Sequence, residues 1–432
     1  MTPNVKGLAR RVKIGEVHFS SFTTEPNYDQ MKKIFLSLVL SFFYLSCYCQ
    51  LANPVNLTSD NKLLGLGERH VISSEILNED RPIIISLPVG YEAEQSNYPV
   101  IYVLDGLENI KHTVGTIELL SESGLIAPLI IVGIQSLDRA RDLTPSNAGQ
   151  NVYGGTGNAG ISQSGGASKF LSFIENELIP YIETNYKTHP FRILEGHSFG
   201  GLFCVYAMMN KPNVFDAFII EAPALWWNNE EMTEQAKEFF KENASFDKTV
   251  YFGVGGNEGW GMRQELIRYV DVIKEKEPKD LRWKHEEVGD EDHMSSRLLL
   301  NYNGLKFLFS DLRIDEKLKM EYTDHAFLKA EESLMEKYGQ NARRPAGDYV
   351  DLVLKLEGED NLQGAITILE RATKAYPNYI GLLTYLVKLY EKTDQIEKAI
   401  NTIKTGIEVS KRYKLGQEDD LIMELDRLKG KN

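Results

Sequence analysis

Cysteine is scarce in this chain of 432 residues. Only three cysteines occur, and two of them, Cys47 and Cys49, lie in a short apolar segment near the N-terminus. If that segment is removed, Cys204 alone remains and no intramolecular disulfide can form. Cys204 lies in an apolar helical run, where a small buried side chain is expected rather than a reactive thiol. Cysteines and histidines nowhere have the spacing of metal ligands, so we expect no metal or other cofactor.

Positive charge is also in deficit. Lysine and arginine number 48 against 62 acidic residues, which gives a formal net charge of −14 and a pI of about 5.2. A chain with this balance lacks the basic surface that attracts phosphate backbones, so nucleic acid is not expected as a partner.

Long hydrophobic runs are almost absent. The exception is residues 31–49, which begin with Met31-Lys-Lys and continue through a short apolar run to a small-residue end. This pattern predicts a secretory signal peptide, too short for a membrane span, with cleavage near Cys49 and an exported, periplasmic or secreted, mature chain. Lipid attachment at Cys47 is less favoured because Tyr44-Leu-Ser-Cys47 is a poor lipoprotein motif. We interpret residues 1–30 as a mis-annotated upstream extension, with translation starting at Met31.

Strand and helix patterns alternate from residue 51. Unbroken apolar runs are typical of a parallel sheet with helices on both faces. The pattern predicts an α/β domain over residues 50–312, with a mostly parallel, doubly wound sheet. The Gly-rich loop 146–166 is expected to be a mobile segment near a site. The strands are expected at 81–90, 98–104, 129–134, 191–194, 217–220, 249–254 and 282–288, and the helices at 169–186, 202–209 and 263–274.

One motif lies between a predicted strand and a predicted helix. Gly196-His-Ser-Phe-Gly200 has the Gly-x-Ser-x-Gly form of a nucleophile elbow, in which a strained turn exposes the serine at the carboxyl end of a sheet. The motif is common by chance, and a plain Gly-rich turn is the alternative. Its strand-then-helix context favours Ser198 as a nucleophile.

A serine nucleophile needs a base, and the base needs an acid that orients it. His293 follows the last predicted strand, where a catalytic histidine is expected in this order of elements. His197 is beside the serine and is expected to point elsewhere. Glu258, after the strand at 249–254, is the favoured acid, while Asp290 and Asp292 remain open because both are close to His293 in sequence.

An oxyanion hole requires two backbone N–H groups. Phe199 is expected to supply one of them, since it follows the nucleophile. The other is expected from Gly106 or Leu107, after the strand at 98–104, with Leu107 preferred. Asp105 is then interpreted as a turn former.

Residues from about 72 to 312 resemble the putative esterase family of α/β hydrolases, with its enterochelin-esterase-like, feruloyl-esterase-like and S-formylglutathione-hydrolase-like members. The resemblance implies an α/β-hydrolase fold with Ser198 as nucleophile, His293 as base and Glu258 as acid. The stretch Glu221-Ala222-Pro223 departs from the family, whose members often have serine before the proline. The stretches that carry the resemblance are 99–106, 132–145, 195–202, 222–227 and 292–293.

Three side chains are candidates for the substrate pocket. Trp226 and Trp227 are expected to wall it, with ordinary core packing as an equal alternative. Arg139, like Arg141, could bind an anionic substrate group or pair with Asp138 or Asp142.

The composition turns helical over residues 313–432. The stretch 365–369 recurs as 399–403, a period of 34 residues that predicts tetratricopeptide-like hairpins. Two repeats are few for an independent solenoid. We therefore expect them to pack on the preceding domain or on a helix at 324–338. They would serve as a structural cap, as a surface for a protein partner or a dimer, or as a module close enough to the Ser198 pocket to restrict large substrates.

Together these patterns predict an exported serine esterase that forms an acyl-enzyme on Ser198. Its substrate would be a small-molecule or glycan ester, either a carbohydrate-linked acyl ester or a siderophore ester. The alternative is a non-catalytic scaffold that uses the helical repeats.

Overall fold

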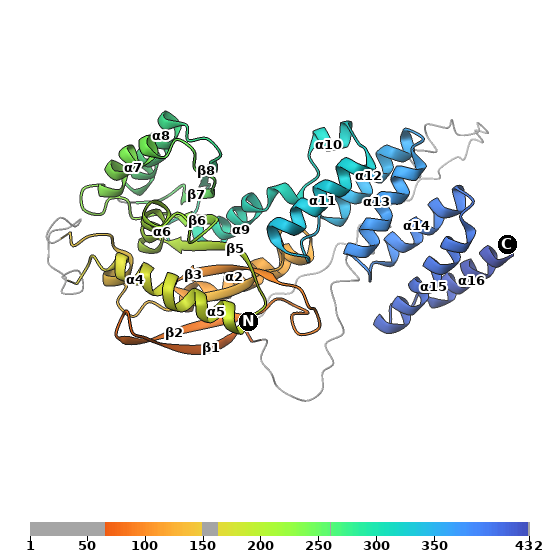
Figure 1. Cartoon of the computed structure of the whole chain (residues 1–432), viewed down its shortest axis with the longest axis horizontal. Helices are drawn as coiled ribbons and strands as arrows, with labels where there is room; N and C mark the ends of the chain where they lie inside the picture. The colour runs from red at the N-terminus through yellow and green to blue at the C-terminus, as the bar shows by residue number, and fades with distance from the viewer. Residues whose placement is uncertain (1–64, 149–162, 260, 431–432) are drawn as a thin grey trace, which may run out of the picture. The chain divides into compact units, whose positions relative to one another are not determined.

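The computed structural model describes residues 65–148, 163–259 and 261–430 (Figure 1). The expected signal peptide at 31–49, the segment 1–30 and most of the loop 146–166 lie outside the described residues. The strands are β1 Glu68–Ser74, β2 Glu79–Ser86, β3 Tyr98–Leu104, β4 Ile130–Ile134, β5 Thr188–His197, β6 Ala217–Glu221, β7 Thr249–Gly255 and β8 Arg282–Val288. The helices up to residue 312 are α2 Gly106–Glu122, α3 Arg139–Leu143, α4 Ala167–Phe173, η1 Ile174–Leu178, α5 Ile179–Asn185, α6 Phe199–Asn210, α7 Glu231–Glu242, α8 Met262–Lys276, α9 Ser296–Leu308 and η2 Ser310–Leu312.

The strands form one sheet in the order β1-β2-β4-β3-β5-β6-β7-β8. β2 pairs antiparallel with both β1 and β4, and the remaining neighbours are parallel. The predicted α/β fold with a mostly parallel sheet is thus confirmed. β1 was not predicted, because it lies at the edge of the sheet and most of its residues are exposed or only partly buried, so it has no continuous apolar run.

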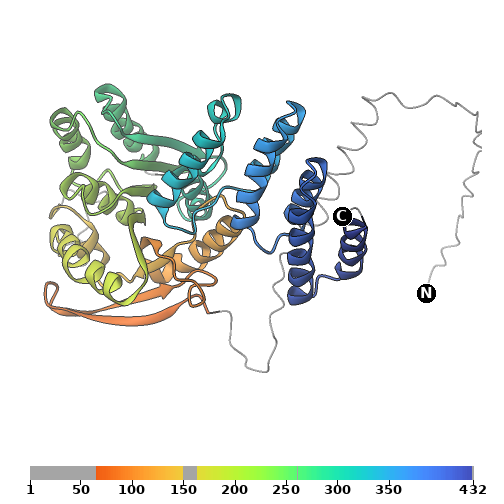
Figure 2. The same ribbon diagram turned by 45° about the vertical axis from the view of Figure 1, so that its right-hand side comes forward.

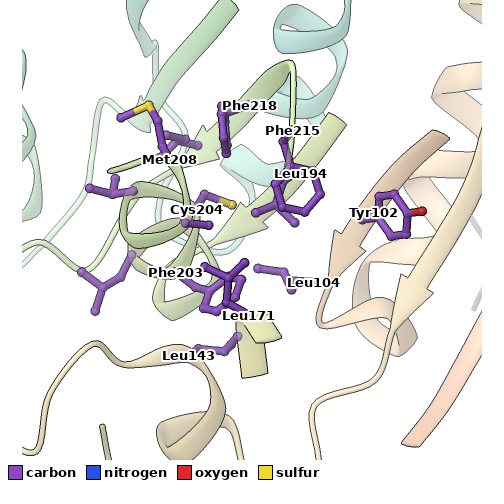
Figure 3. Packing of buried hydrophobic residues seen from close by; sticks show 14 of the residues in the cluster. Tyr102, Leu104, Leu143, Leu171, Leu194, Phe203, Cys204, Met208, Phe215 and Phe218 are labelled. Carbon is purple, nitrogen blue, oxygen red and sulfur yellow. The ribbon is translucent and has the colours of Figure 1, made fainter. Parts of the chain in front are cut away.

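Helices cover both faces of the sheet, and each strand contributes alternate side chains to the two cores (Figure 1). One face packs against α4, α6, α7 and α8, and the other against α2 and α9. Figure 3 shows the first face, where Phe203 and Cys204 of α6 lie beside Leu194 of β5. Cys204 is fully buried, as expected for a structural side chain.

Seven further helices follow the sheet domain, and Figure 2 shows them from a second angle. The repeat is visible in the helix starts. α13 and α15 begin at Leu362 and Ile396, 34 residues apart, and Ala365 and Ala399 are fully buried at matching positions. Each helix from α12 to α15 packs against the next helix along the chain. These helices are α10 Glu316–Met320, α11 Asp324–Tyr338, α12 Ala346–Gly358, α13 Leu362–Ala375, α14 Ile380–Lys392, α15 Ile396–Tyr413 and α16 Glu418–Lys429.

α11 joins the helical region to the sheet domain. Tyr338 lies edge-on to Phe191 at the start of β5, with ring centroids 5.0 Å apart, and Leu334 belongs to the same core. The guanidinium of Arg343 donates to the carbonyls of Ser121 and Glu122 at the end of α2. These contacts lie at the amino end of β5, whereas Ser198 follows its carboxyl end. Among the helices in the described ranges, none has the length and apolarity needed to cross a membrane.

Candidate active site

Ser198 sits in a strained turn between β5 and α6. Its backbone has φ 61° and ψ −114°, an unusual conformation for a residue with a side chain. The turn is tight because a Cβ added to Gly196 would lie 2.5 Å from the backbone carbon of Gly200. The first backbone N–H groups of α6 have no partner within the helix, and the positive end of the helix dipole is at the serine. The geometry is that of the predicted elbow.

His293 and Glu258 come from the loops after two neighbouring parallel strands, β8 and β7. The Nδ1 atom of His293 lies 2.9 Å from Oε2 of Glu258, whose side chain is fully buried. Asp292 instead accepts the backbone N–H groups of Met294 and Ser295 in its own loop, and these bonds lower its pKa. The carboxylate that contacts the imidazole is therefore that of Glu258.

The prediction for His197 was wrong. Its ring does not point away from the site but lies 4.4 Å from the ring of His293, between centroids. The side chain is buried, and burial together with the nearby charges of His293, Arg297 and Arg139 holds its pKa well below the usual value. His197 is therefore a neutral imidazole beside the candidate base.

The two candidate oxyanion donors begin neighbouring helices. β3 and β5 are adjacent and parallel, so the starts of α2 and α6 lie at the same edge of the sheet. Leu107 is in the first turn of α2 with an exposed side chain, and Phe199 is the first residue of α6. No hydrogen bond joins Ser198 Oγ to a side chain in the described part of the chain, so the contact between nucleophile and base belongs to the proposal below.

Comparison with known proteins places this chain in a family. A family model described as "Putative esterase" matches residues 74–296, more than half of the chain. The chain belongs to the putative esterase family. It is 32% identical over 162 residues to a siderophore enterobactin esterase of Emericella nidulans, and 30% identical over 183 residues to a ferri-bacillibactin esterase of Bacillus subtilis. These matches cover 34% and 40% of this chain and 52% and 63% of the two relatives, so the chain spans less than two thirds of their length.

Three solved structures have the same fold as this chain. An IroE-like serine hydrolase from Shewanella oneidensis superimposes with a TM-score of 0.59 at 25% identity, covering 72% of this chain and 99% of its own. The BES protein from Bacillus cereus gives 0.50 at 28% identity, over 57% and 97%. An uncharacterised protein from Capnocytophaga ochracea, at 15% identity, shares the fold with a TM-score of 0.56 over 84% of this chain and 99% of its own.

Arg139 of this esterase-family chain pairs with neither of the two expected carboxylates. Its Nε donates to Oδ2 of Asp105 at 2.8 Å, and its Nη2 donates to the carbonyl of His197 at 3.0 Å. Arg141, in contrast, pairs with Asp142, which was one of the expected partners. It also pairs with Glu79. Asp105 is a turn residue with φ 50°, as expected, and it also ties Arg139 to the elbow.

The two tryptophans are not equivalent. Trp227 is fully buried and donates Nε1 to the carbonyl of Ser146, so it is a core residue rather than a pocket wall. Trp226 is partly exposed and packs against Phe199, with ring centroids 5.8 Å apart. The guanidinium carbon of Arg139 lies over the Phe199 ring, 5.3 Å from its centroid. Trp226, Phe199 and Arg139 therefore remain candidates for substrate contact.

Sequence reasoning missed two buried acids in this esterase-family domain. Glu195 and Glu221 lie on β5 and β6, and each is only 1% exposed. Asn301 of α9 donates Nδ2 to both carboxylate oxygens of Glu195 at 3.0 Å. Burial raises the pKa of both carboxyl groups, and the neighbouring Glu195 raises that of Glu221 further. The departure noted at Glu221 was the available signal.

Proposed function

We propose that this protein is a serine esterase that hydrolyses carboxylic esters through an acyl-enzyme on Ser198. One observation carries the proposal: the buried carboxylate of Glu258 bonds the imidazole of His293 in the loop order expected after a strained Ser198 elbow. The family match and the serine hydrolase structure at 25% identity support the same chemistry.

The reaction follows from the roles of these groups. His293 Nε2 accepts the proton of the Ser198 hydroxyl as Oγ attacks the ester carbonyl, and the N–H groups of Phe199 and Leu107 stabilise the resulting oxyanion. Glu258 holds the Nδ1–H tautomer and stabilises the imidazolium. The imidazolium then protonates the leaving alcohol. Water, deprotonated by the same imidazole, releases the acid from the acyl-enzyme and restores Ser198.

The substrate class we favour is a siderophore ester. Three relatives at 30–32% identity are named as esterases of siderophores, namely enterobactin, triacetylfusarinine C and ferri-bacillibactin. Arg139 would offer a partly exposed cation beside Phe199 for an anionic group of such a substrate. A carbohydrate-linked acyl ester is the second candidate. Export remains part of the proposal, since it rests on residues 31–49.

Turnover by the purified protein tests the proposal. We expect hydrolysis of a short-chain p-nitrophenyl ester and of a triscatecholate trilactone, and Ser198→Ala should remove about 10³-fold or more of kcat while leaving the fold intact. Ser172→Ala is the matched control, because this exposed serine is on α4 and bonds only the backbone of its own helix. Equal inertness of wild type and Ser198→Ala on every ester would instead favour the non-catalytic scaffold.

The same assay tests the acid. Glu258→Gln should lose less activity than Ser198→Ala, because the acid orients and stabilises the imidazole rather than attacking the substrate. Asp292→Asn is the control, since Asp292 bonds the backbone of its own loop. A large loss in Asp292→Asn with an unchanged rate in Glu258→Gln would contradict the assignment.

A further inference from the structure

The loop that carries His293 is tied to α2 by a side chain that the reaction does not use. Arg297 is half-buried in the first turn of α9, four residues after His293. Its Nε donates to the carbonyl of Met294 at 3.1 Å, and its Nη1 donates to Oδ1 of Asn109 at 3.2 Å. One guanidinium therefore bonds both the histidine loop and α2.

Asn109 extends this connection to the other side of the site. It is 3% exposed on α2, and its Nδ2 donates to the carbonyl of Leu104 at 2.9 Å. Leu104 is the last residue of β3, immediately before the turn that leads to Leu107. The chain of bonds from Met294 through Arg297 and Asn109 to Leu104 thus joins the base loop to the junction of β3 and α2, and Leu107 lies in the first turn of that helix.

Arg297 also faces the buried groups beneath the site. Its positive charge contributes to the lowered pKa of His197, the ring of which contacts His293, and it opposes the raised pKa of Glu221. A cation at this position disfavours a second imidazolium next to His293. This leaves His293 as the imidazole that takes the proton.

We propose that Arg297 is a positioning residue for the esterase reaction, which fixes the loop of His293 through Asn109 to the start of α2, where Leu107 lies. The proposal rests on the proposed function for its kinetic consequence, but not for its structural one. A planar guanidinium bonds two acceptors in fixed directions, which a lysine ammonium does not reproduce. The base and the oxyanion donor need this precision, because a displacement of about 1 Å of a catalytic group costs up to ~10²-fold in rate.

Kinetics of four variants and one control variant test the proposal. In Arg297→Ala and Arg297→Lys we expect kcat per titrated active site to fall about 10- to 100-fold with KM nearly unchanged. Asn109→Ala should show a similar loss of kcat. The double variant, Arg297→Ala with Asn109→Ala, should lose less than the product of the two single losses. Arg282→Ala is the matched control, because Arg282 bonds the carbonyls of Phe307 and Leu308 at the far end of α9. It should lower stability without changing kcat.

Hydrogen exchange separates this proposal from the proposed function. Amide exchange over residues 289–295 should accelerate in Arg297→Ala and Arg297→Lys but not in Arg282→Ala. If the wild type hydrolyses no ester, the proposed function fails, and accelerated exchange still establishes that Arg297 holds the loop. Unchanged exchange in both Arg297 variants, or a kcat per active site equal to that of the wild type, would overturn the proposal.

Discussion

Buried acids occur in both regions of the molecule, but their surroundings differ. In the sheet domain, Glu195 and Glu221 lie on adjacent strands, and neither forms an ion pair with a described residue. In the helical region, Glu331 of α11 is equally buried, yet it bonds Arg344 and Arg371 and accepts the hydroxyl of Tyr349.

The difference shows how each region handles buried charge. An unpaired carboxylate in an apolar interior is costly, so Glu195 and Glu221 respond by raised pKa values and retained protons. Glu331 instead forms ion pairs with two arginines, which fix the geometry of the helices around it. The buried acids near Ser198 thus lack a charged partner, whereas the buried acid of the helical region joins several segments of the chain.

The largest expected effect is on kcat, when His293 of the sheet domain is replaced. The matched control is a histidine of the helical region, so the assay shows which of the two regions carries the activity. His293→Ala should lower kcat by about 10³-fold or more, because the serine loses its base. In the wild type, kcat/KM should fall toward acid pH on a single ionisation, because an imidazolium cannot accept the proton of Ser198. Steady-state kinetics across pH measures both. His325→Ala, an exposed histidine of α11, is the control and should be silent. Full activity in His293→Ala would mean that another group is the base.

Removal of the helical region would show whether the sheet domain is stable without it. Ending the chain after Leu312 removes Leu334 and Tyr338 from the core around Phe191. We expect aggregation of that fragment, measured by light scattering, because the core would be left open. A chain ending after Pro345 keeps α11 and should be more soluble. Equal solubility of the two fragments would show that α11 is dispensable.

The contacts of the helical region correct one expectation from the sequence, and the same fragments test the correction. The repeats were expected to lie close enough to the Ser198 pocket to restrict large substrates. Their contacts with the sheet domain are instead at the amino end of β5 and at the end of α2. The preference between a small and a bulky ester should therefore be unchanged in the soluble fragment.

A smaller effect is expected from the paired acid of the helical region. Glu331→Gln should destabilise the fold by about 3 kcal/mol or more, because it leaves Arg344 and Arg371 without their shared carboxylate. Urea unfolding measures the loss, while kcat per active site should stay constant. Glu332→Gln, at the exposed neighbouring position, is the control. A neutral Glu331→Gln would remove the contrast between the two regions.

Local patterns in the sequence predicted the sheet and much of the site. Apolar runs located β3, β6 and β7, and the motif located Ser198, because burial and turn chemistry depend on residues that are adjacent in the sequence. His197 was misjudged because the predicted strand ended at Leu194. In the structure β5 continues to His197, so alternation places that side chain on the same face as Glu195.

Distant contacts that neither a motif nor the order of elements specifies were beyond such reasoning. The pairing of Arg139 with Asp105 joins residues 34 positions apart in sequence, and that of Arg297 with Asn109 joins residues 188 apart. Asp138 and Asp142 were the expected partners because they are sequence neighbours. Which of several carboxylates a cation meets depends on how loops from different strands converge at one edge of the sheet. Periodicity carries no information on that convergence.

The smallest expected effect is a pH dependence of stability that originates in the unpaired acids. The pKa of Glu195 is raised to about 8 in the folded protein by burial. A raised pKa means that the folded state holds the proton more tightly than the unfolded chain does. The stabilisation is therefore complete below the ordinary pKa of glutamate and is lost as pH rises toward about 8.

Glu195→Gln should flatten this dependence, because the amide keeps the size of the acid and cannot ionise. In the wild type, the free energy of unfolding should fall by up to about 1.4 kcal/mol per pH unit for each such proton between pH 6 and 8. The variant should lose the part of that slope that Glu195 contributes. The loss should be larger if removal of the Glu195 charge also lets the pKa of Glu221 fall toward its usual value. Urea titrations at pH 6 and 8 measure the slope, with exposed Glu118→Gln as the control. An identical slope in wild type and Glu195→Gln would show that the carboxyl is already ionised at pH 6, and that the buried acids of the two regions handle charge in the same way.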